Sequence, residues 1–523
     1  MYTMTKIESY QKEIGEIIAA GRIKKGMTQS ELAEKIETSQ PAINRIEKGR
    51  QNISLDMVAR IGEVLGTQIL TINNGGAVSF RVEGGHKLSG STTVKSSKNA
   101  AIALMIASLV NKGRTVLKGV SKIEEVFRIA EVIESIGVKV RWINDKKDLE
   151  IIPPRVLEIE KLDLVAARRT RTAMMLMAPL LYQYDKFELP YAGGCSLGER
   201  TIEPHLLALR HFGLSVDATS VPGVYNATVD TDMKKKVCTK GHVEKIVLIE
   251  RGDTVTEHAL IAAALCPGTT IIKNASPNYM VQDVCFYLQD LGVKIEGIGS
   301  TTLRVTGLAE INRDVEYTPS EDPIEAMFFI AAALVTESEI TIKRAPIDFL
   351  EIELEVLRTM NAEFEVSDEY VSGNGRTTLV DLTMKKSDLV APTDKIHPMP
   401  YPGLNIDNLP FFALIAACAK GRTLIHDWVY ENRAVYITNL SALGAKVELL
   451  DAHRVYVEGK TRWKPADITT PNALRPAAIL LLAMMAAPGN SILRDVYIIN
   501  RGYEDLANRL TKLGAHVGLL TNI

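Results

Sequence analysis

The chain repeats one short pattern six times: SIGVKV at 135–140, HFGLSV at 211–216, DLGVKI at 290–295, TMNAEF at 359–364, ALGAKV at 442–447 and KLGAHV at 512–517. In each copy a glycine or asparagine follows a helical stretch, and residues of alternating polarity come after it. Gly and Asn adopt the left-handed conformation that closes a helix, and alternation is typical of a strand. The pattern predicts six copies of a helix that runs into a strand.

A second, apolar segment lies upstream of most of these signatures. The six such segments are AAIALMIASLV at 100–110, TAMMLMAPLL at 172–181, HALIAAAL at 258–265, AMFFIAAALV at 326–335, PFFALIAACA at 410–419 and AAILLLAMMAA at 477–487. Because they are apolar all round and too long for strands, we predict buried helices. Units of roughly 75 residues with this content predict a pseudo-symmetric α/β body with closed lobes.

Composition and charge exclude several classes of protein. Hydrophobic residues make up 46% and charged residues 24% of the chain, as in soluble globular proteins. The net charge of −2 excludes a chain-wide binder of polyanions. The longest apolar run, 477–487, is too short to span a bilayer, which needs about 20 residues. The N-terminal residues lack the apolar core of a secretory signal, so we predict a cytoplasmic protein with no membrane contact.

The sequence lacks the usual motifs for metals and nucleotide cofactors. Its cysteines, at 195, 238, 266, 285 and 418, are too far apart along the chain for a zinc or dithiol motif, so we predict that any functional cysteine acts alone. There is no HExxH, and the glycines at 21 and 26 are followed by Met27 instead of the lysine of a P-loop. We predict no cofactor and no metal site.

Residues 1–72 have a different pattern, of short helices, and are followed by a turn-rich linker at 73–76. In MTQSELAEKIETSQPAINRIEKG (27–49), Thr28 and Ser39 are placed to cap two helices on either side of a turn near 37–38. The apolar residues at core spacing are Leu32, Ala33, Ile36, Ile43 and Ile46. This pattern predicts a helix-turn-helix domain.

The helix-turn-helix resembles the Cro/repressor-like (XRE) DNA-binding family. The resemblance implies a groove-facing side that consists of Gln29, Ser39, Gln40, Pro41, Asn44 and Arg45. Residues 20–50 carry seven basic and four acidic side chains, a balance of the right sign for double-stranded DNA. The alternative is a module that only dimerises or packs on the body, because a fold does not guarantee a function.

Two stretches of the body suit chemistry on an anion. Lys98 and Asn99 open the first buried helix, where backbone N–H groups and a lysine together favour negative charge. Cys195 lies in a Gly-Gly-Cys-x-x-Gly loop, with Arg200 five residues on. A cysteine on a flexible loop beside a guanidinium is suited to act as an acid or a nucleophile.

Several motifs stand in the order of the enolpyruvyl transferase family, which residues 77–523 resemble. They are GGHKLSG at 84–90, Lys98–Asn99, Arg171 with Pro179, GGCSLGER at 193–200, ENR at 431–433 and RGYE at 501–504. The resemblance implies a two-lobed fold of six βαβ-type repeats with pseudo-threefold lobes. It also implies one lobe of 77–97 and 317–523 and another, with the Cys195 loop, of 98–316.

The resemblance implies transfer of the enolpyruvyl group of phosphoenolpyruvate to the 3′-hydroxyl of UDP-N-acetylglucosamine, with release of phosphate, for peptidoglycan precursors. Cys195 would be the general acid, Asp407 would take or orient the hydroxyl proton, and Lys98 would assist. The implied phosphoenolpyruvate ligands are the cations Lys98, Arg171, Arg200, Arg475 and Arg501. The implied UDP-sugar ligands are Asn99, Arg171, Arg200, Thr201, Ile202, Glu203 and Asp407.

The chain departs from the family pattern where the acceptor binds. After Arg200 the family has Pro-Val-Asp, and this chain has residues 201–203, TIE; near the diphosphate it has GDTVTE (252–257) in place of Ser-Val-Gly-Ala-Thr-Glu. Ala473 and Asn500 each replace an aspartate. Two alternatives therefore stay open: an acceptor that is another nucleotide or UDP-sugar, and a DNA-binding regulator whose body senses a ligand. A homodimer is also left open.

Overall fold

The computed structural model describes residues 78–191, 201–431 and 433–520, together with 25–36, 38–48 and further positions between 15 and 64. The chain divides into two units. The first consists of Met1–Val78 with Leu520–Ile523, and the second of Ser79–Leu519.

The first unit contains the two predicted helices, α2 (Gln29–Lys35) and α3 (Gln40–Glu47). The Thr28 hydroxyl accepts a hydrogen bond from the Glu31 N–H at 3.2 Å, and the Glu31 carboxylate accepts one from the Thr28 N–H at 2.6 Å. The predicted cap at Thr28 is therefore confirmed as a reciprocal capping box. Ser39 precedes α3 as predicted, but its hydroxyl makes no capping bond. Pro41 in the first turn lacks an N–H, which removes one usual donor to such a cap.

The core of the first unit is the one that the sequence predicts. Its buried residues are Ile18, Leu32, Ala33, Ile36, Ile43, Ile46 and Ile61. Both helices therefore bury one apolar face, and the opposite face of α3 stays exposed to solvent at Ser39, Gln40, Pro41 and Arg45.

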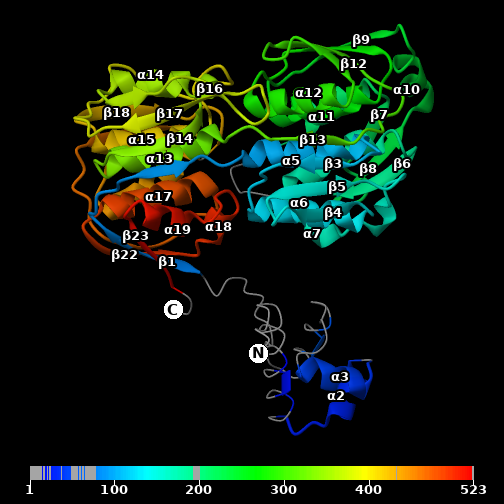
Figure 1. Cartoon of the computed structure of the whole chain (residues 1–523), viewed down its shortest axis with the longest axis horizontal. Helices are drawn as coiled ribbons and strands as arrows, with labels where there is room; N and C mark the ends of the chain where they lie inside the picture. Colours follow the sequence, from blue (N-terminus) through cyan, green and yellow to red (C-terminus); the bar gives the residue numbers. More distant parts are fainter. Residues whose placement is uncertain are drawn as a thin grey trace. The chain divides into compact units, whose positions relative to one another are not determined.

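Among its described residues the second unit forms six sheets (Figure 1), and each sheet contains one strand that begins one to three residues after the glycine or asparagine of a signature. These strands are β4 (Lys139–Ile143), β7 (Leu214–Asp217), β11 (Lys294–Glu296), β15 (Phe364–Val366), β19 (Lys446–Leu449) and β23 (His516–Leu520). The glycine or asparagine of every signature has a positive φ, from 59° at Asn361 to 99° at Gly444. The predicted α/β fold of six units is confirmed.

The other strands complete these sheets. They are β1 (Ser79–Gly84), β2 (Ser91–Thr93), β3 (Thr115–Leu117), β5 (Asp148–Ile152), β6 (Lys186–Pro190), β8 (Val224–Val229), β9 (Val243–Val247), β10 (Thr269–Lys273), β12 (Thr302–Thr306), β13 (Val315–Tyr317), β14 (Ile340–Pro346), β16 (Tyr370–Val371), β17 (Thr378–Met384), β18 (Gly421–His426), β20 (Arg454–Gly459), β21 (Asp467–Thr469) and β22 (Gly489–Arg494).

The sheets gather into two lobes, which Figure 1 shows side by side. The first lobe holds β13-β3-β5-β4, β6-β8-β7 and β11-β12-β10-β9, and the second holds β15-β17-β14-β2, β18-β20-β19 and β21-β22-β1-β23. Strands β1 and β2 precede the first lobe in sequence, yet they pair with β22 and β14 of the second. The chain therefore crosses between the lobes twice.

Five of the six predicted buried helices are confirmed: α5 (Lys98–Ala107), α11 (Asp253–Ala264), α13 (Pro323–Val335), α15 (Leu409–Cys418) and α17 (Leu474–Ala486). The segment at 172–181 is instead the 3-10 helix η3 (Arg171–Leu176) followed by the short helix α8 (Met177–Leu180). Pro179 explains the difference, because it cannot donate to the carbonyl of Met175 and its ring would clash with that carbonyl in an α-helix.

The helices that end at the signatures pack around these buried helices. They are α6 (Glu124–Ser135), α9 (Glu203–Arg210), α12 (Tyr279–Asp290), α14 (Glu351–Thr359), η5 (Thr438–Leu443) and α19 (Leu506–Lys512). Shorter helices are η1 (Ser108–Val110), η2 (Ile159–Lys161), α7 (Leu164–Arg168), α10 (Thr231–Val237), η4 (Ile347–Phe349), α16 (Arg433–Ile437) and α18 (Tyr497–Asn500). No described helix is long and apolar enough to cross a membrane.

Two cysteines that are distant in sequence lie in contact in the first lobe. A hydrogen bond from Cys266 lowers the pKa of the Cys238 thiol, and the Tyr182 hydroxyl lies 3.8 Å from Cys238 Sγ. The sequence spacing gives no sign of this contact, because the fold brings together two residues that lie 28 positions apart.

Candidate active site

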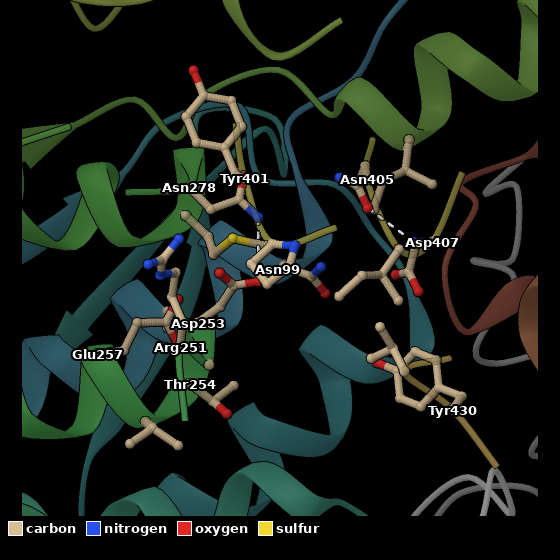
Figure 2. Close-up of a pocket in the computed structure, with 18 of the residues that line it drawn as sticks. Asn99, Arg251, Asp253, Thr254, Glu257, Asn278, Tyr401, Asn405, Asp407 and Tyr430 are labelled. Atoms are coloured by element: carbon tan, nitrogen blue, oxygen red, sulfur yellow. Dashed lines mark hydrogen bonds between the residues drawn. The ribbon is translucent and has the colours of Figure 1, made fainter. Parts of the chain in front are cut away.

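A cleft of about 1330 Å³ opens between the two lobes, and Figure 2 shows part of its lining. Its walls bring together seven of the residues predicted to bind substrate: Lys98, Asn99, Arg171, Thr201, Asp407, Arg475 and Arg501. Lys98 and Arg475 lie in the first turns of α5 and α17. The positive ends of two helix dipoles therefore reinforce the side-chain charges there.

Glu125 on α6 forms an ion pair with Arg501 and attracts the charge of Lys98. Arg501 donates to Glu125 Oε2 from Nη2 at 2.9 Å and from Nε at 3.1 Å, and the Thr170 hydroxyl donates to Oε1 at 3.0 Å. Burial alone would raise the pKa of Glu125, but Lys98 and Arg501 outweigh it and the pKa is lowered. Burial lowers the pKa of Lys98, which Glu125 opposes. The ionised Glu125 thus holds Arg501 at the cleft and stabilises the charged form of Lys98.

Asp407 lies between two guanidinium groups of the second lobe. Its carboxylate oxygens are 3.7 Å from Arg433 Nη1 and 3.7 Å from Arg475 Nη2, and its N–H donates to the Asn405 side chain at 2.9 Å. Cations at this distance stabilise the charged form of a carboxyl. Asp407 is therefore fixed in position and can accept a proton from a group in the cleft.

The two arginines beside Asp407 are both buried and have different neighbours. Arg475 donates to the Tyr503 hydroxyl at 2.8 Å, and although burial opposes it, nearby Tyr503, Asp407 and Asp322 raise the pKa of Arg475. Arg433, in the ENR motif, donates to Asp427 and to the Ile406 carbonyl. It therefore supports the loop that carries Asp407 as well as lining the cleft.

Comparison with known proteins agrees with this geometry. Residues 82–510 match the family model of EPSP synthase (3-phosphoshikimate 1-carboxyvinyltransferase). The chain belongs to the EPSP synthase family. Two relatives are each named UDP-N-acetylglucosamine 1-carboxyvinyltransferase. The protein of Treponema denticola is 30% identical over 84% of this chain and 99% of its own length, and that of Bradyrhizobium diazoefficiens is 31% identical over 84% and 97%.

Solved structures of the EPSP synthase family share the fold. The enolpyruvyl transferase NikO from Streptomyces tendae superposes with a TM-score of 0.72 at 23% identity, over 85% of this chain and 99% of that one. An EPSP synthase from Acinetobacter baumannii gives a TM-score of 0.62 at 18% identity, over 85% and 100%. Outside the family region, residues 18–72 match a helix-turn-helix model. Both resemblances read from the sequence motifs are confirmed.

Four residues predicted from the EPSP synthase family motifs are not seen in the cleft wall. Cys195 and Arg200 lie outside the described residues. Ile202 and Glu203 lie outside the lining of the cleft: Ile202 is buried before α9, and Glu203 forms an ion pair with Arg210 at 3.0 Å. Thr201 reaches the cleft because Arg171 Nη2 donates to its backbone carbonyl at 2.9 Å. Roles for these residues stay predictions.

Another part of the cleft wall is acidic, which the sequence motifs did not predict. It includes Glu250, Asp253, Glu257, Asp348, Glu351 and Glu353, and Figure 2 shows Asp253 and Glu257 close together. Asp253 accepts from the Ser276 hydroxyl at 2.5 Å and from the Asn278 amide at 3.2 Å, and burial followed by repulsion from Asp407 raises its pKa. The departure at 252–257 was the sequence signal that pointed to this wall.

Glu257 and a neighbouring histidine pair are buried behind that wall. Glu257 is 2% exposed, its Oε1 has no hydrogen-bond partner among the described residues, and burial with nearby Asp253 raises its pKa well above the usual range. His205 Nδ1 lies 3.2 Å from His258 Nδ1, and burial lowers the pKa of His205 to about 3. Burial therefore disfavours the charged forms of Glu257 and His205 at this wall.

Amide side chains join the two helices of the helix-turn-helix. Gln29 Oε1 accepts from Gln40 Nε2 at 2.8 Å and from Asn44 Nδ2 at 3.2 Å. Gln29 Nε2 in turn donates to Glu47 at 2.7 Å. Five of the six residues predicted for the groove-facing side, Gln29, Gln40, Pro41, Asn44 and Arg45, therefore lie on or beside α3, and the sixth, Ser39, precedes it.

Proposed function

We propose that this chain transfers the enolpyruvyl group of phosphoenolpyruvate to the 3′-hydroxyl of UDP-N-acetylglucosamine and releases phosphate. The observation that carries this proposal is the convergence of Lys98, Arg475 and Arg501 with Asp407 on one cleft. The names of the relatives with 30–31% identity support the choice of donor and acceptor.

The cations would bind the donor, which carries a phosphate and a carboxylate. Arg475 and Arg501 offer planar guanidinium groups that match both anions bidentately. Lys98 and Arg171 add positive charge from the first lobe. Because these groups are held before substrate arrives, as in the Arg501–Glu125 pair at 2.9 Å, they stabilise developing charge without reorganisation.

The reaction needs one base and one acid on the two reactants. Asp407 would take the hydroxyl proton as the acceptor oxygen attacks C2 of phosphoenolpyruvate, while Cys195 protonates the C3 methylene. The resulting tetrahedral intermediate then loses a C3 proton as the C2–O bond to phosphate breaks, which restores the double bond. Asn99 at the start of α5 would position the sugar.

An assay of phosphate release from phosphoenolpyruvate tests the proposal. With UDP-N-acetylglucosamine we expect turnover that is lost in Cys195→Ala and kept in Cys418→Ala, a matched cysteine far from the cleft motifs. Absence of turnover with every acceptor, combined with ligand-dependent DNA binding, would instead support a ligand-sensing regulator.

A second candidate differs only in the acceptor, and the acidic wall favours it. Asp253, at the start of α11, lies where the departure at 252–257 occurs, and its carboxylate would repel a diphosphate unless it is protonated. Another nucleotide or UDP-sugar would then be the preferred acceptor. The ratio of kcat/KM for UDP-N-acetylglucosamine to that for UMP and for other UDP-sugars decides between the two.

We also propose that residues 18–72 bind double-stranded DNA through α3. The exposed positions of Gln40 and Arg45 support this role. In a mobility-shift selection from random duplexes with the full chain, Arg45→Ala should weaken binding at least about tenfold. Lys35→Ala, an exposed cation on α2, is the control and should have a smaller effect. Equal retention by both variants would contradict the proposed face.

We also propose a cellular location and an oligomeric state for the protein. We place the reaction in the cytoplasm, since its donor is a metabolite of that compartment. A homodimer is proposed through the first unit, because repressor-like modules commonly dimerise. Sedimentation of the full chain and of a chain lacking residues 1–72 tests it: loss of the dimer only in the truncated chain is the expected result.

A further inference from the structure

A second pocket of about 350 Å³ adjoins the reaction cleft at Arg501, which lines both. Its other lining residues are Arg128, Arg168, Arg169, Thr470, Pro471, Asn472, Asp495, Tyr497 and Ile498. The arginines at 128–169 belong to the first lobe, and residues 470–501 belong to the second. The pocket therefore spans the boundary between the lobes.

Arg128 is fixed at the centre of this pocket by contacts with both lobes. Its Nη1 donates to the Arg169 carbonyl at 3.1 Å, and its Nη2 donates to the Tyr497 hydroxyl at 2.8 Å. The Tyr497 hydroxyl in turn donates to Glu124 at 2.6 Å. Arg128 Nε is buried and has no hydrogen-bond partner among the described residues. A buried donor in this state costs free energy that a bound acceptor would recover.

The carboxylates around the pocket neutralise only part of its positive charge. Among the described residues, the side chains of Arg168 and Arg169 form no ion pair, and Asp495 is the one carboxylate in the described lining. Glu124 lies 3.5 Å from Arg128 Nε, and Glu125 holds Arg501. Four arginines line this one small volume, and their net positive charge favours an anion there.

We infer that this pocket binds a small phosphorylated anion, at a site separate from the one where phosphoenolpyruvate reacts. Guanidinium groups recognise phosphate oxygens through paired N–H donors. The volume is at the low end of those of small-molecule sites, which suits a diphosphate or a sugar phosphate and excludes a whole nucleotide sugar. Thr470 and Tyr497 add hydroxyl groups that can bind further oxygens.

Such a ligand would affect the reaction cleft through Arg501. An anion in the second pocket attracts the Arg501 guanidinium away from Glu125, and Glu125 also supports the charge of Lys98. The bound anion would also link the first lobe to the second, because its ligands come from both lobes. We therefore expect the bound anion to change KM for phosphoenolpyruvate more than kcat.

Calorimetric titration of the full chain with inorganic pyrophosphate tests the site directly, without need for turnover. We expect a binding event that Arg168→Ala/Arg169→Ala weakens at least about tenfold. The matched control is Arg141→Ala/Arg155→Ala, which removes two exposed arginines of the same lobe outside the pocket and should bind as the wild type does. Arg168→Lys/Arg169→Lys keeps the charge without the paired donors and should bind with intermediate affinity.

Thermal denaturation shows whether the variants are folded, and both arginines are exposed enough for substitution to leave the core intact. If the two alanine double variants bind pyrophosphate with equal affinity, the anion binds in the reaction cleft alone and the inference is overturned. In kinetic assays with pyrophosphate present, KM for phosphoenolpyruvate should shift in the wild type and in the control. A shift of equal size in Arg168→Ala/Arg169→Ala would likewise overturn it.

Discussion

The two walls of the reaction cleft differ in whether their charged groups have neighbours of opposite charge. On the basic wall, Lys98 and Arg501 face Glu125, and Arg475 faces Asp407. On the acidic wall, Asp253, Glu257 and Glu353 form no ion pair with any described residue, and burial raises the pKa of each. Desolvation disfavours an isolated charge, while an opposite charge nearby restores it.

Because of this difference, each wall suits a different part of a substrate. The basic wall keeps its charges and is ready for the two anionic groups of the donor. On the acidic wall burial disfavours the charged forms of Asp253, Glu257 and Glu353. Such carboxyl groups can still make hydrogen bonds, as Asp253 does with Ser276 and Asn278. The acidic wall is therefore better suited to hydroxyl and amide groups of the acceptor than to phosphate.

Removal of a charge from the basic wall should have the largest effect. Arg475→Ala takes away a buried guanidinium beside Asp407, and we expect kcat/KM for phosphoenolpyruvate to fall about 1000-fold. Arg494→Ala, a partly exposed arginine of the same lobe that is paired with Asp467 and lies outside the cleft lining, is the control and should leave kinetics unchanged. A fall of less than tenfold in folded Arg475→Ala would show that the donor is held elsewhere.

Glu125→Gln should change the pH dependence on the same wall. Glu125 raises the pKa of Lys98 against the effect of burial. Without that carboxylate, Lys98 loses its proton at lower pH, so the alkaline limb of kcat/KM for phosphoenolpyruvate should move toward neutral pH. At alkaline pH the rate should fall about tenfold below that of the wild type. Parallel pH profiles for the two proteins would refute the coupling of Glu125 to Lys98.

The features read correctly from the sequence are those that local physics enforces. The six signatures predicted six helix ends because Gly137, Asn361 and their counterparts need a positive φ, and few residues tolerate that conformation. The basic wall was predicted residue by residue, since Lys98, Arg171 and Arg501 each stand in a motif of a known family. The local backbone geometry and the order of the family motifs are therefore enough to predict this part of the structure.

The features that were missed depend on distant residues. The acidic wall combines Glu257 of α11 with Glu353 of α14, which lie nearly a hundred positions apart in the sequence. The sequence alone does not distinguish a glutamate that becomes buried from one that stays on the surface. Arg128 and Tyr497 meet only because the lobes do. The prediction from sequence also missed the 3-10 helix at 171–176, although Pro179 indicated that an α-helix would be interrupted there.

Asp253→Asn should have a moderate effect, confined to the acceptor. The amide keeps the shape of the side chain but cannot become negative, so the repulsion of a diphosphate disappears. We expect KM for UDP-N-acetylglucosamine to fall about fivefold, equivalent to about 1 kcal/mol, with KM for phosphoenolpyruvate unchanged. Equal changes in both constants would mean that Asp253 acts on the whole cleft instead of on the acceptor.

Glu257→Gln should have the smallest effect, on stability and not on turnover. Burial raises the pKa of Glu257 well above its usual range, whereas the unfolded chain has an ordinary glutamate pKa of about 4.3. The folded state therefore binds the extra proton, and the stability that this gives is complete below about pH 4.3 and is lost as pH rises toward the folded pKa.

Glutamine cannot titrate, so the variant should lose less stability than the wild type between pH 5 and pH 8, by about 1 kcal/mol. Thermal denaturation at the two pH values measures this difference. Glu363→Gln, at an exposed position, is the control and should follow the wild type. If Glu257→Gln shows the wild-type decline, Glu257 is ionised in the folded protein. The acidic wall would then keep a buried negative charge, and the contrast between the two walls would be one of sign alone.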